Sequence, residues 1–168
     1  MRIENSTIED VETIIGLYQD AVAYQKIVAE QPWEEFDQRF IETEIREQRQ
    51  WKIIIDDQIA CVFALSFYDA TVKKEAGKDQ AIYIHRIATN PLLRGNSFVK
   101  YIVTWSKIYG RQTGKQFVRV LTVFGNLKLN NYLISCGFNY MGIVRPGNGE
   151  ASSAKHKPRA VALFEIVV

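Results

Sequence analysis

Hydrophobic residues near the start of the chain recur with the period of an α-helix. After a short extended segment at residues 2–4, STIEDVETIIGLYQDAV places Ser6 and Glu9 at the spacing of a capping box. The apolar residues that follow lie on one helical stripe: Ile8, Val11, Ile14, Ile15, Tyr18 and Val22. A second stripe runs through PWEEFDQRFIETEIREQRQ, whose Pro32 suits a first helical turn. The pattern therefore predicts two amphipathic helices.

The hydrophobic pattern changes to that of β-strands near residue 50. WKIIIDDQIACVFALSFY contains two β-rich runs, Lys52–Ile55 and Ile59–Phe67, which Asp56-Asp57-Gln58 joins at the spacing of a hairpin. A polar loop, DATVKKEAGKDQ, follows. The next run, AIYIHRIAT, is so largely apolar that we expect a strand covered on both faces.

The second half of the chain alternates helical and strand patterns. A helix is predicted from near Ser97, then a strand at QFVRVLTVF, then a short helix with Asn126 as its cap and Gly137 as its stop. NYMGIVR and RAVALFEIVV are strand-like and flank the Gly/Ser/Pro-rich loop PGNGEASSAKHKP. The order β-α-α-β-β-β-α-β-α-β-β predicts an α/β (α+β) fold with a mixed, mostly antiparallel central sheet covered by helices on both faces.

Composition narrows the class of protein. A chain of 168 residues with 47% hydrophobic residues suits one domain, residues 1–168, with a proper core. The 21 basic and 19 acidic residues give a formal charge of +2, too small to indicate nucleic acid as the main partner, although anionic small molecules remain compatible with it. Cys61 and Cys136 lie in apolar segments, which favours buried free thiols over a disulfide framework or a metal site. With a polar N-terminus and no long apolar run, we expect a cytoplasmic protein without a membrane segment.

One short turn between a predicted strand and a predicted helix carries candidate chemistry. In TNPLLRGNSFV, the helix start leaves its first N–H groups without intrahelical acceptors and beside the positive end of the helix dipole. Gly95 permits close approach of a ligand to the backbone, and Arg94 offers a planar fork of donors. The turn could hold a pyrophosphate. The alternative is an ordinary tight connection with a solvated arginine.

With its surroundings, this turn resembles the GNAT superfamily of N-acetyltransferases, and the resemblance covers nearly the whole chain. The family pattern runs from a strand through hydrophobic-x-P-x-x-R-G-x-G-x-G/A into a helix, then a strand, an Asn, and a short helix closing with Tyr-x-x-x-Gly-Phe. TNPLLRGNSFV and NLKLNNYLISCGF stand at those places. The resemblance implies that turn amides cradle the coenzyme A pyrophosphate, that the preceding strand contacts the acetyl and pantetheine part, and that the Asn touches the pantetheine. The implied residues are Arg94, Gly95, Asn96, Ser97, Phe98 and Val99 for the turn, Ile87, Ala88 and Thr89 for the strand, and Asn126.

The sequence departs from the family pattern in two places. Ser97 and Val99 stand where the family has two glycines, or a glycine and an alanine, so the turn must accept Cβ atoms there. Leu133 stands where many members carry a tyrosine as general acid. The neighbouring Tyr132 points about 100° away on a helix, so no general acid is assigned.

His85 and Arg86 bear on the choice of a general base. His85 lies in the strand before the turn and is a candidate base near neutral pH, with a packed strand histidine as the alternative. Arg86 occupies roughly the place where some relatives carry a basic-acting glutamate. Water or substrate geometry can therefore replace a protein base in the expected reaction.

Three further features have both a functional and a structural interpretation. Cys136 is a thiol, but its apolar neighbours favour burial over nucleophilic catalysis. The basic run KHKPR, residues 155–159, suits either the coenzyme's 3′-phosphate or an exposed loop. Trp33 and Phe36 could line an acceptor pocket, although their helical spacing also explains them as core.

The function that these observations favour is acetyl-CoA-dependent N-acetyl transfer to an amine of a small molecule or a protein, by direct attack. Acetyl-CoA is then a co-substrate, and no metal is expected. The alternative is a non-catalytic, GNAT-like module that binds acyl-CoA as a sensor or assembly unit. The sequence leaves open the acceptor and the oligomeric state, a homodimer included.

Overall fold

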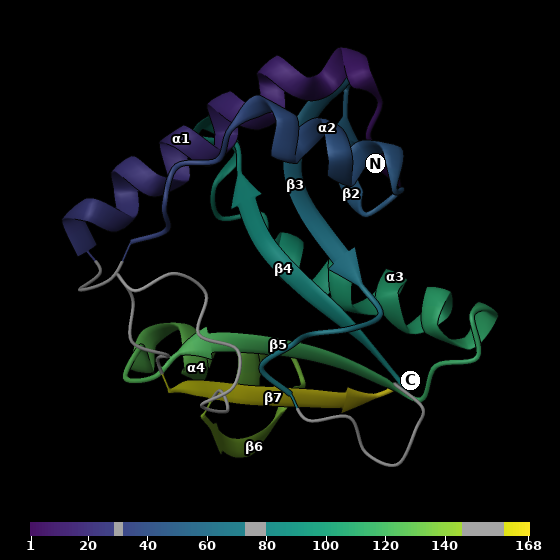
Figure 1. Cartoon of the computed structure of the whole chain (residues 1–168), viewed down its shortest axis with the longest axis vertical. Coiled ribbons are helices and arrows are strands. Elements are labelled where there is room, and N and C mark those ends of the chain that lie inside the picture. Colours follow the sequence, from purple (N-terminus) through teal and green to yellow (C-terminus); the bar gives the residue numbers. More distant parts are fainter. Residues whose placement is uncertain (29–31, 73–79, 146–159) are drawn as a thin grey trace. The chain divides into compact units, whose positions relative to one another are not determined.

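The computed structural model describes residues 1–28, 32–72, 80–145 and 160–168, and its elements follow the predicted order (Figure 1). The strands are β1 Arg2–Asn5, β2 Gln50–Ile55, β3 Gln58–Ser66, β4 Ala81–Thr89, β5 Phe117–Val123, β6 Asn139–Val144 and β7 Val161–Val167. The α-helices are α1 Val11–Val28, α2 Gln38–Arg46, α3 Phe98–Gln112 and α4 Leu127–Ser135, and short 3-10 helices span Ile8–Asp10 and Pro91–Leu93.

The strands form one mixed sheet in the order β1-β2-β3-β4-β5-β7-β6. β4 and β5 pair in parallel, whereas β1 with β2, β2 with β3, β5 with β7, and β6 with β7 pair antiparallel. The parallel pair follows from the connection, because α3 lies between β4 and β5 and supplies the crossover that parallel strands require. The predicted mixed, mostly antiparallel sheet is confirmed.

The chain divides into two compact units, each with its own buried residues. The first unit is Met1–Leu65 with His85–Ile102, and the second is Ser66–Ile84 with Val103–Val168. In the first unit, successive residues of β2 and β3 are buried, so both faces of these strands are covered. In the second unit, β5 and β7 bury alternate residues, among them Val118 and Phe164.

The start of the first helical segment differs by one residue from the prediction. Ser6 and Glu9 do not form the predicted capping box. The Ser6 N–H donates to the Gln50 carbonyl at 2.9 Å, so the chain still follows the sheet at this residue. The turn begins at Thr7, whose N–H donates to Asp10 Oδ2 at 2.6 Å. Strand pairing therefore moves the helix start one position along.

The second helix begins later than Pro32, where it was predicted. α2 starts at Gln38 because Asp37 Oδ1 accepts a hydrogen bond from the Phe40 N–H at 2.7 Å. The chain before it has another partner, since the Trp33 N–H donates to Gln25 Oε1 of α1 at 2.8 Å. Contact with α1 thus replaces a first helical turn at Pro32.

The predicted hairpin between β2 and β3 is confirmed. Asp56 and Asp57 have φ values of 47° and 58°, the left-handed conformation that a two-residue hairpin turn with matching twist needs at both positions. Aspartate tolerates this conformation better than most residues other than glycine. The turn therefore forms without an Asn-Gly or Asp-Gly pair.

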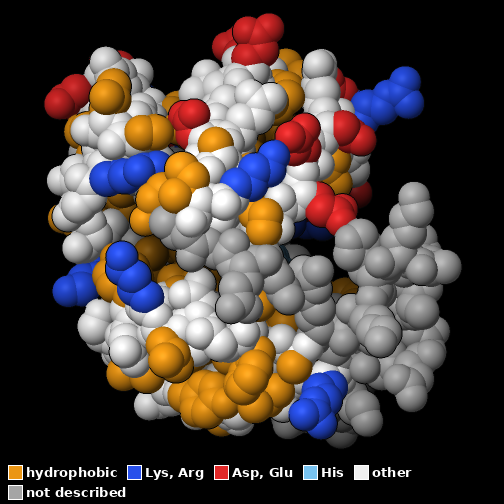
Figure 2. Space-filling model, turned by 90° about the vertical axis from the view of Figure 1, so that its left-hand side faces the viewer, with side chains coloured by type: hydrophobic (Ala, Val, Ile, Leu, Met, Phe, Trp, Pro, Cys, Tyr) orange, Lys and Arg blue, Asp and Glu red, His pale blue; other side chains and the backbone are white. Residues whose placement is uncertain are grey.

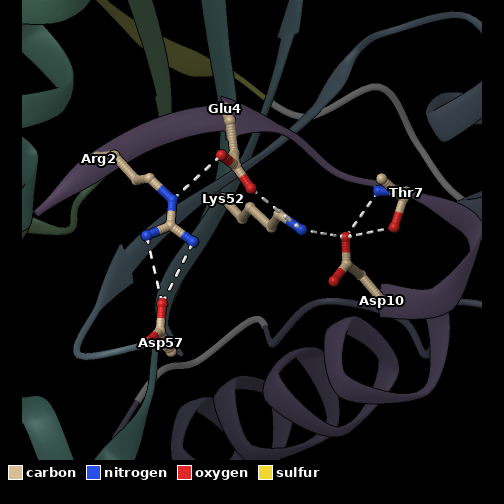
Figure 3. Close-up of polar contacts among 6 residues, drawn as sticks. All are labelled: Arg2, Glu4, Thr7, Asp10, Lys52 and Asp57. Atoms are coloured by element: carbon tan, nitrogen blue, oxygen red, sulfur yellow. Dashed lines mark hydrogen bonds and ion pairs between the residues drawn. The ribbon is translucent and has the colours of Figure 1, made fainter.

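A buried lysine fastens the beginning of α1 to the sheet. Lys52 of β2 is 7% exposed, and its Nζ lies 2.7 Å from Asp10 Oδ2 (Figure 3). Burial alone would raise the pKa of Asp10, but the hydrogen bonds from Lys52 and the Thr7 N–H outweigh it and hold the pKa below 3.8. The charged carboxylate therefore stabilises the folded state.

We expect Asp10→Asn to lower the free energy of unfolding near neutral pH by about 1–3 kcal/mol. Lys52 then loses its short contact with the Asp10 carboxylate and keeps, among the described residues, only the more exposed Glu4, at 3.5 Å, as a counter-charge. Since the folded-state pKa of Asp10 lies below the unfolded value of 3.8, its contribution is present above that pH and disappears as pH falls through the folded-state pKa. Urea unfolding of both proteins from neutral to strongly acidic pH measures the difference.

Asp57→Asn is the matched control, because the Asp57 side chain is 90% exposed and lies 3.4 Å from Arg2. It should change stability little at any pH. An Asp10→Asn effect that stayed constant into strong acid would contradict the assigned role of the carboxylate.

Candidate functional site

Asn90 fastens the turn after β4 to β3. Its backbone N–H donates to the Ala60 carbonyl at 2.9 Å, and its Nδ2 donates to the Ile59 carbonyl at 3.4 Å. Its Oδ1 accepts a hydrogen bond from the Leu92 N–H at 3.0 Å, at the start of the 3-10 helix Pro91–Leu93. This short helix was not predicted from the sequence. It fixes the direction in which the chain leaves the sheet.

Two residues of the turn have left-handed backbone conformations. Gly95 has a φ of 91° and Ser97 a φ of 52°. Glycine enters this region without steric cost, whereas a residue with a Cβ incurs roughly 1–2 kcal/mol of strain. A Cβ built on Gly95 would meet no atom within 4 Å. The turn is therefore open at Gly95 and strained at Ser97, the position where the resemblance predicts a glycine.

Consecutive backbone N–H groups of this turn have no hydrogen-bond acceptor within the described residues. They belong to Gly95, Asn96, Ser97, Phe98 and Val99. α3 begins at Phe98, so its dipole places roughly half a positive charge at the same point. Residues 94–97 are exposed. The arrangement can bind an anionic group through the backbone.

The Arg94 guanidinium lies over an aromatic ring of α1. Its guanidinium carbon lies 4.8 Å from the centre of the Tyr24 ring. Its N–H groups have no acceptor in the part of the chain that the structure describes. The stacking thus orients the group and leaves its donors available to an oxyanion. Tyr24 could not be predicted from the sequence, because only the tertiary structure brings α1 beside this turn.

The strand segment before the turn is Ile87, Ala88 and Thr89. Ala88 is 2% exposed, whereas Ile87 and Thr89 are half-buried. The Thr89 hydroxyl donates to Cys61 Sγ at 3.7 Å. Burial raises the pKa of the Cys61 thiol to about 12 despite this hydrogen bond, so the sulfur is a neutral core group rather than a nucleophile.

Arg86 is a left-handed residue inside a strand. It has a φ of 49° in β4, and its guanidinium forms an ion pair with Glu44 of α2. The Glu44 side chain is 4% exposed. The guanidinium carbon also lies 5.7 Å from the Phe36 ring centre and 5.0 Å from that of Phe40. From the sequence, Arg86 stands out only as a replaced glutamate. Glu44 could not be predicted, because the ion pair joins segments that are distant in the chain.

Aromatic side chains of α1 and the segment before α2 pack together near this pair. Tyr18 is 1% exposed, and its ring centre lies 6.2 Å from that of Trp33 and 5.0 Å from that of Phe36. Burial raises the pKa of Tyr18 to about 12, so its hydroxyl is neutral and donates to Gln50 Oε1 at 3.2 Å. Trp33 and Phe36 pack against the core cluster of this unit. Their role in an acceptor pocket stays a prediction, as does that of the half-buried His85 as a base.

Asn126 begins α4, as predicted. Its Oδ1 accepts a hydrogen bond from the Leu129 N–H at 3.1 Å. Leu133, on the same helix, is 1% exposed and belongs to the core of the second unit. A packed aliphatic side chain therefore occupies the position where many members of the resembled family carry a tyrosine. Tyr132 is the preceding residue of the same helix.

Other predicted features have simple outcomes. Cys61 is buried and Cys136 is half-buried, and neither forms a disulfide. The basic run at residues 155–159 lies outside the described residues. Residues 1–28, 32–72, 80–145 and 160–168 contain no group of three His, Cys, Asp or Glu side chains suited to a metal ion, and no helix among them has the length and apolarity to cross a membrane. Lys/Arg and Asp/Glu side chains both appear on the face in Figure 2.

No protein-family model matches the sequence, and no curated protein matches it significantly. Solved structures do match its fold. A GNAT-family acetyltransferase from Listeria monocytogenes aligns with a TM-score of 0.72 and 19% identity, over 99% of this chain and 94% of that one. The ribosomal-protein-alanine N-acetyltransferase from Brucella melitensis aligns with a TM-score of 0.70 and 13% identity over 100% of both chains.

A third match contains a bound coenzyme. The protein yncA from Salmonella typhimurium, solved with acetyl-CoA, has a TM-score of 0.70 and 11% identity, over 99% of this chain and 93% of that one. At such identities the likeness establishes the fold. TNPLLRGNSFV and NLKLNNYLISCGF resemble the same superfamily, so the fold expected from the sequence agrees with the fold of the structure. The chain therefore has the fold of the GNAT superfamily of N-acetyltransferases.

Proposed function

We propose that this protein is an acetyl-CoA-dependent N-acetyltransferase that acts on an amine of a small molecule or a protein. The observation that carries the proposal is the turn between β4 and α3, where the amides of residues 95–99 have no acceptor among the described residues and Arg94 stacks on Tyr24. The fold supports it, because similarly folded proteins are acetyltransferases and one of them holds acetyl-CoA. The free cysteines are in keeping with a cytoplasmic location.

Each part of the coenzyme has a proposed partner. The amides of residues 95–99 and the Arg94 guanidinium bind the pyrophosphate, because both are donors without acceptors in the described protein. Backbone groups of Ile87, Ala88 and Thr89 bind the acetyl and pantetheine part. For Asn126, whose Oδ1 caps α4, the contact with the pantetheine rests on the family resemblance alone.

The proposed reaction is direct attack by the acceptor amine. Its nitrogen lone pair forms a bond to the thioester carbonyl carbon. The C–S bond then breaks and coenzyme A leaves as a thiolate. The amine proton passes to water or to a base such as His85. A thiol has an ordinary pKa of about 8.5, so the thiolate can leave without a general acid. Positioning and backbone donors to the developing oxyanion supply most of the rate.

A second function has two specific observations in its favour. Ser97 has a Cβ and a left-handed backbone conformation where the resembled family has a glycine. Leu133 is a buried core residue where that family often has a tyrosine. Both features suit a domain that binds acyl-CoA without turnover. Binding and transfer must therefore be measured separately.

Coenzyme A and acetyl-CoA should raise the thermal midpoint, because a ligand that binds only the folded state stabilises it by about 2.7 kcal/mol at 100-fold excess over its Kd. Gly95→Val should weaken coenzyme binding at least about tenfold, since its side chain would stand where the pyrophosphate approaches. Differential scanning fluorimetry and calorimetric titration measure the two effects.

Gly114→Val is the control for backbone strain, because Gly114 also has a positive φ, 69°, and open space around an added Cβ. It should reduce stability and leave coenzyme affinity unchanged. Equal affinities of the two variants would show that the turn is only a connection.

Ser97→Gly should raise the free energy of unfolding by about 0.5–1 kcal/mol, because glycine adopts the φ of 52° without strain. It should also tighten coenzyme binding by removing a Cβ from the anion-binding turn. Gln48→Gly is the matched comparison, since Gln48 has a φ of 55° just after α2. That variant should gain stability alone. Improved binding by both, or by neither, would contradict the role given to Ser97.

The wild-type protein should transfer acetyl slowly to at least one amine in a broad panel. The rate should rise with pH as the acceptor amine loses its proton, because only the free base is nucleophilic. Release of free thiol, together with mass spectrometry of the acceptor, separates transfer from hydrolysis. Tight coenzyme binding with no transfer to any amine would favour the non-catalytic acyl-CoA-binding module instead.

A further inference from the structure

The strained residue in β4 requires an explanation that the proposed chemistry does not supply. Arg86 has a φ of 49° in β4 and directly precedes residues 87–89 of the same strand. A left-handed conformation at a residue with a Cβ persists only where its surroundings hold it. The surroundings of its side chain therefore matter for the backbone that follows.

The side chain of Arg86 is held by α2 rather than by its own strand. Glu44, which is nearly fully buried, forms ion pairs with Arg86 and, at 3.5 Å, with Arg49. The Arg86 guanidinium also lies beside the stacked rings of Phe36 and Phe40. The Nε of Arg86 is buried and has no hydrogen-bond partner within the described residues. The ion pair and the rings, not a complete set of hydrogen bonds, fix this cation in place.

The strand segment between Arg86 and the turn is thus attached at both ends. Asn90 joins the far end to β3 through the Ala60 and Ile59 carbonyls, and Arg86 joins the near end to α2. Irregular residues within strands re-aim the groups that follow them. If Arg86 returned to ordinary strand geometry, the peptide groups of residues 87–89 would turn in new directions.

We propose that Glu44 and Arg86 form a positioning pair for the acyl end of the coenzyme. The inference rests on the proposed function, which assigns the acetyl and pantetheine part to residues 87–89. The pair acts through the backbone conformation at Arg86 and touches neither ligand nor reacting atoms. The pyrophosphate, which the turn at residues 95–99 holds, does not depend on it.

The test compares a ligand that has the acetyl and pantetheine part with a ligand that lacks it. Acetyl-CoA contains every part of the coenzyme, and 3′-phosphoadenosine 5′-diphosphate keeps the pyrophosphate but lacks pantetheine and acetyl. Glu44→Gln and Arg86→Ala should weaken acetyl-CoA binding about tenfold and leave the Kd of the nucleotide within about twofold. Gly95→Val should weaken both. Calorimetric titration of the full chain gives each value.

A further pair of variants separates backbone positioning from loss of charge. Arg86→Ala and Arg86→Gly remove the same guanidinium, but glycine enters a positive φ without strain. Arg86→Gly should therefore lose less acetyl-CoA affinity than Arg86→Ala. Equal losses would overturn the role assigned to the backbone conformation.

Arg46→Ala is the control on α2, because the Arg46 side chain is 66% exposed and pairs with Glu42 one turn earlier on the same helix. Unchanged binding of the nucleotide shows that a variant is folded, and Arg86→Ala alone carries the test if Glu44→Gln fails to fold. Full acetyl-CoA affinity in folded Glu44→Gln and Arg86→Ala, or equal losses for both ligands, would overturn this inference alone. A wild-type protein that binds neither ligand would overturn the proposed function and this inference with it.

Discussion

Where a chain passes from a strand into a helix, its backbone N–H groups no longer have acceptors in the sheet and do not yet have acceptors within the helix. In this protein the change takes place within a few residues, between Thr89 and Phe98. Asn90 donates to two carbonyls of the neighbouring strand, but the amides of residues 95–99 have no acceptor among the described residues. A site for an anion therefore follows from the connection itself, and the side chains around it decide how well it is formed.

Most of the fold could be predicted because its signals are local. The helical stripe of α1 and the β-rich runs around Asp56-Asp57 depend on residues close together in the sequence. Helix starts were less predictable, since a cap competes with tertiary partners. Ser6 pairs with Gln50 of β2 instead of capping a helix, and Trp33 binds α1 instead of beginning α2.

The candidate site shows the same division between local and distant partners. Arg94 and Gly95 could be singled out because their order in the chain carries the information. Glu44 and Tyr24 could not, because each faces its arginine only after α1 and α2 have packed on the sheet. Nor could the φ of Arg86 be inferred, since an arginine within AIYIHRIAT has no local reason to be left-handed.

The buried thiol of Cys61 can serve as a native probe of local unfolding. A thiol with a pKa near 12, shielded by β3 and β4, presents almost no thiolate to solvent while the chain is folded. Unfolding returns it to ordinary reactivity. Modification of Cys61 by a thiol reagent therefore records how often this part of the sheet opens, so a single native side chain reports the rate of local unfolding without any introduced label.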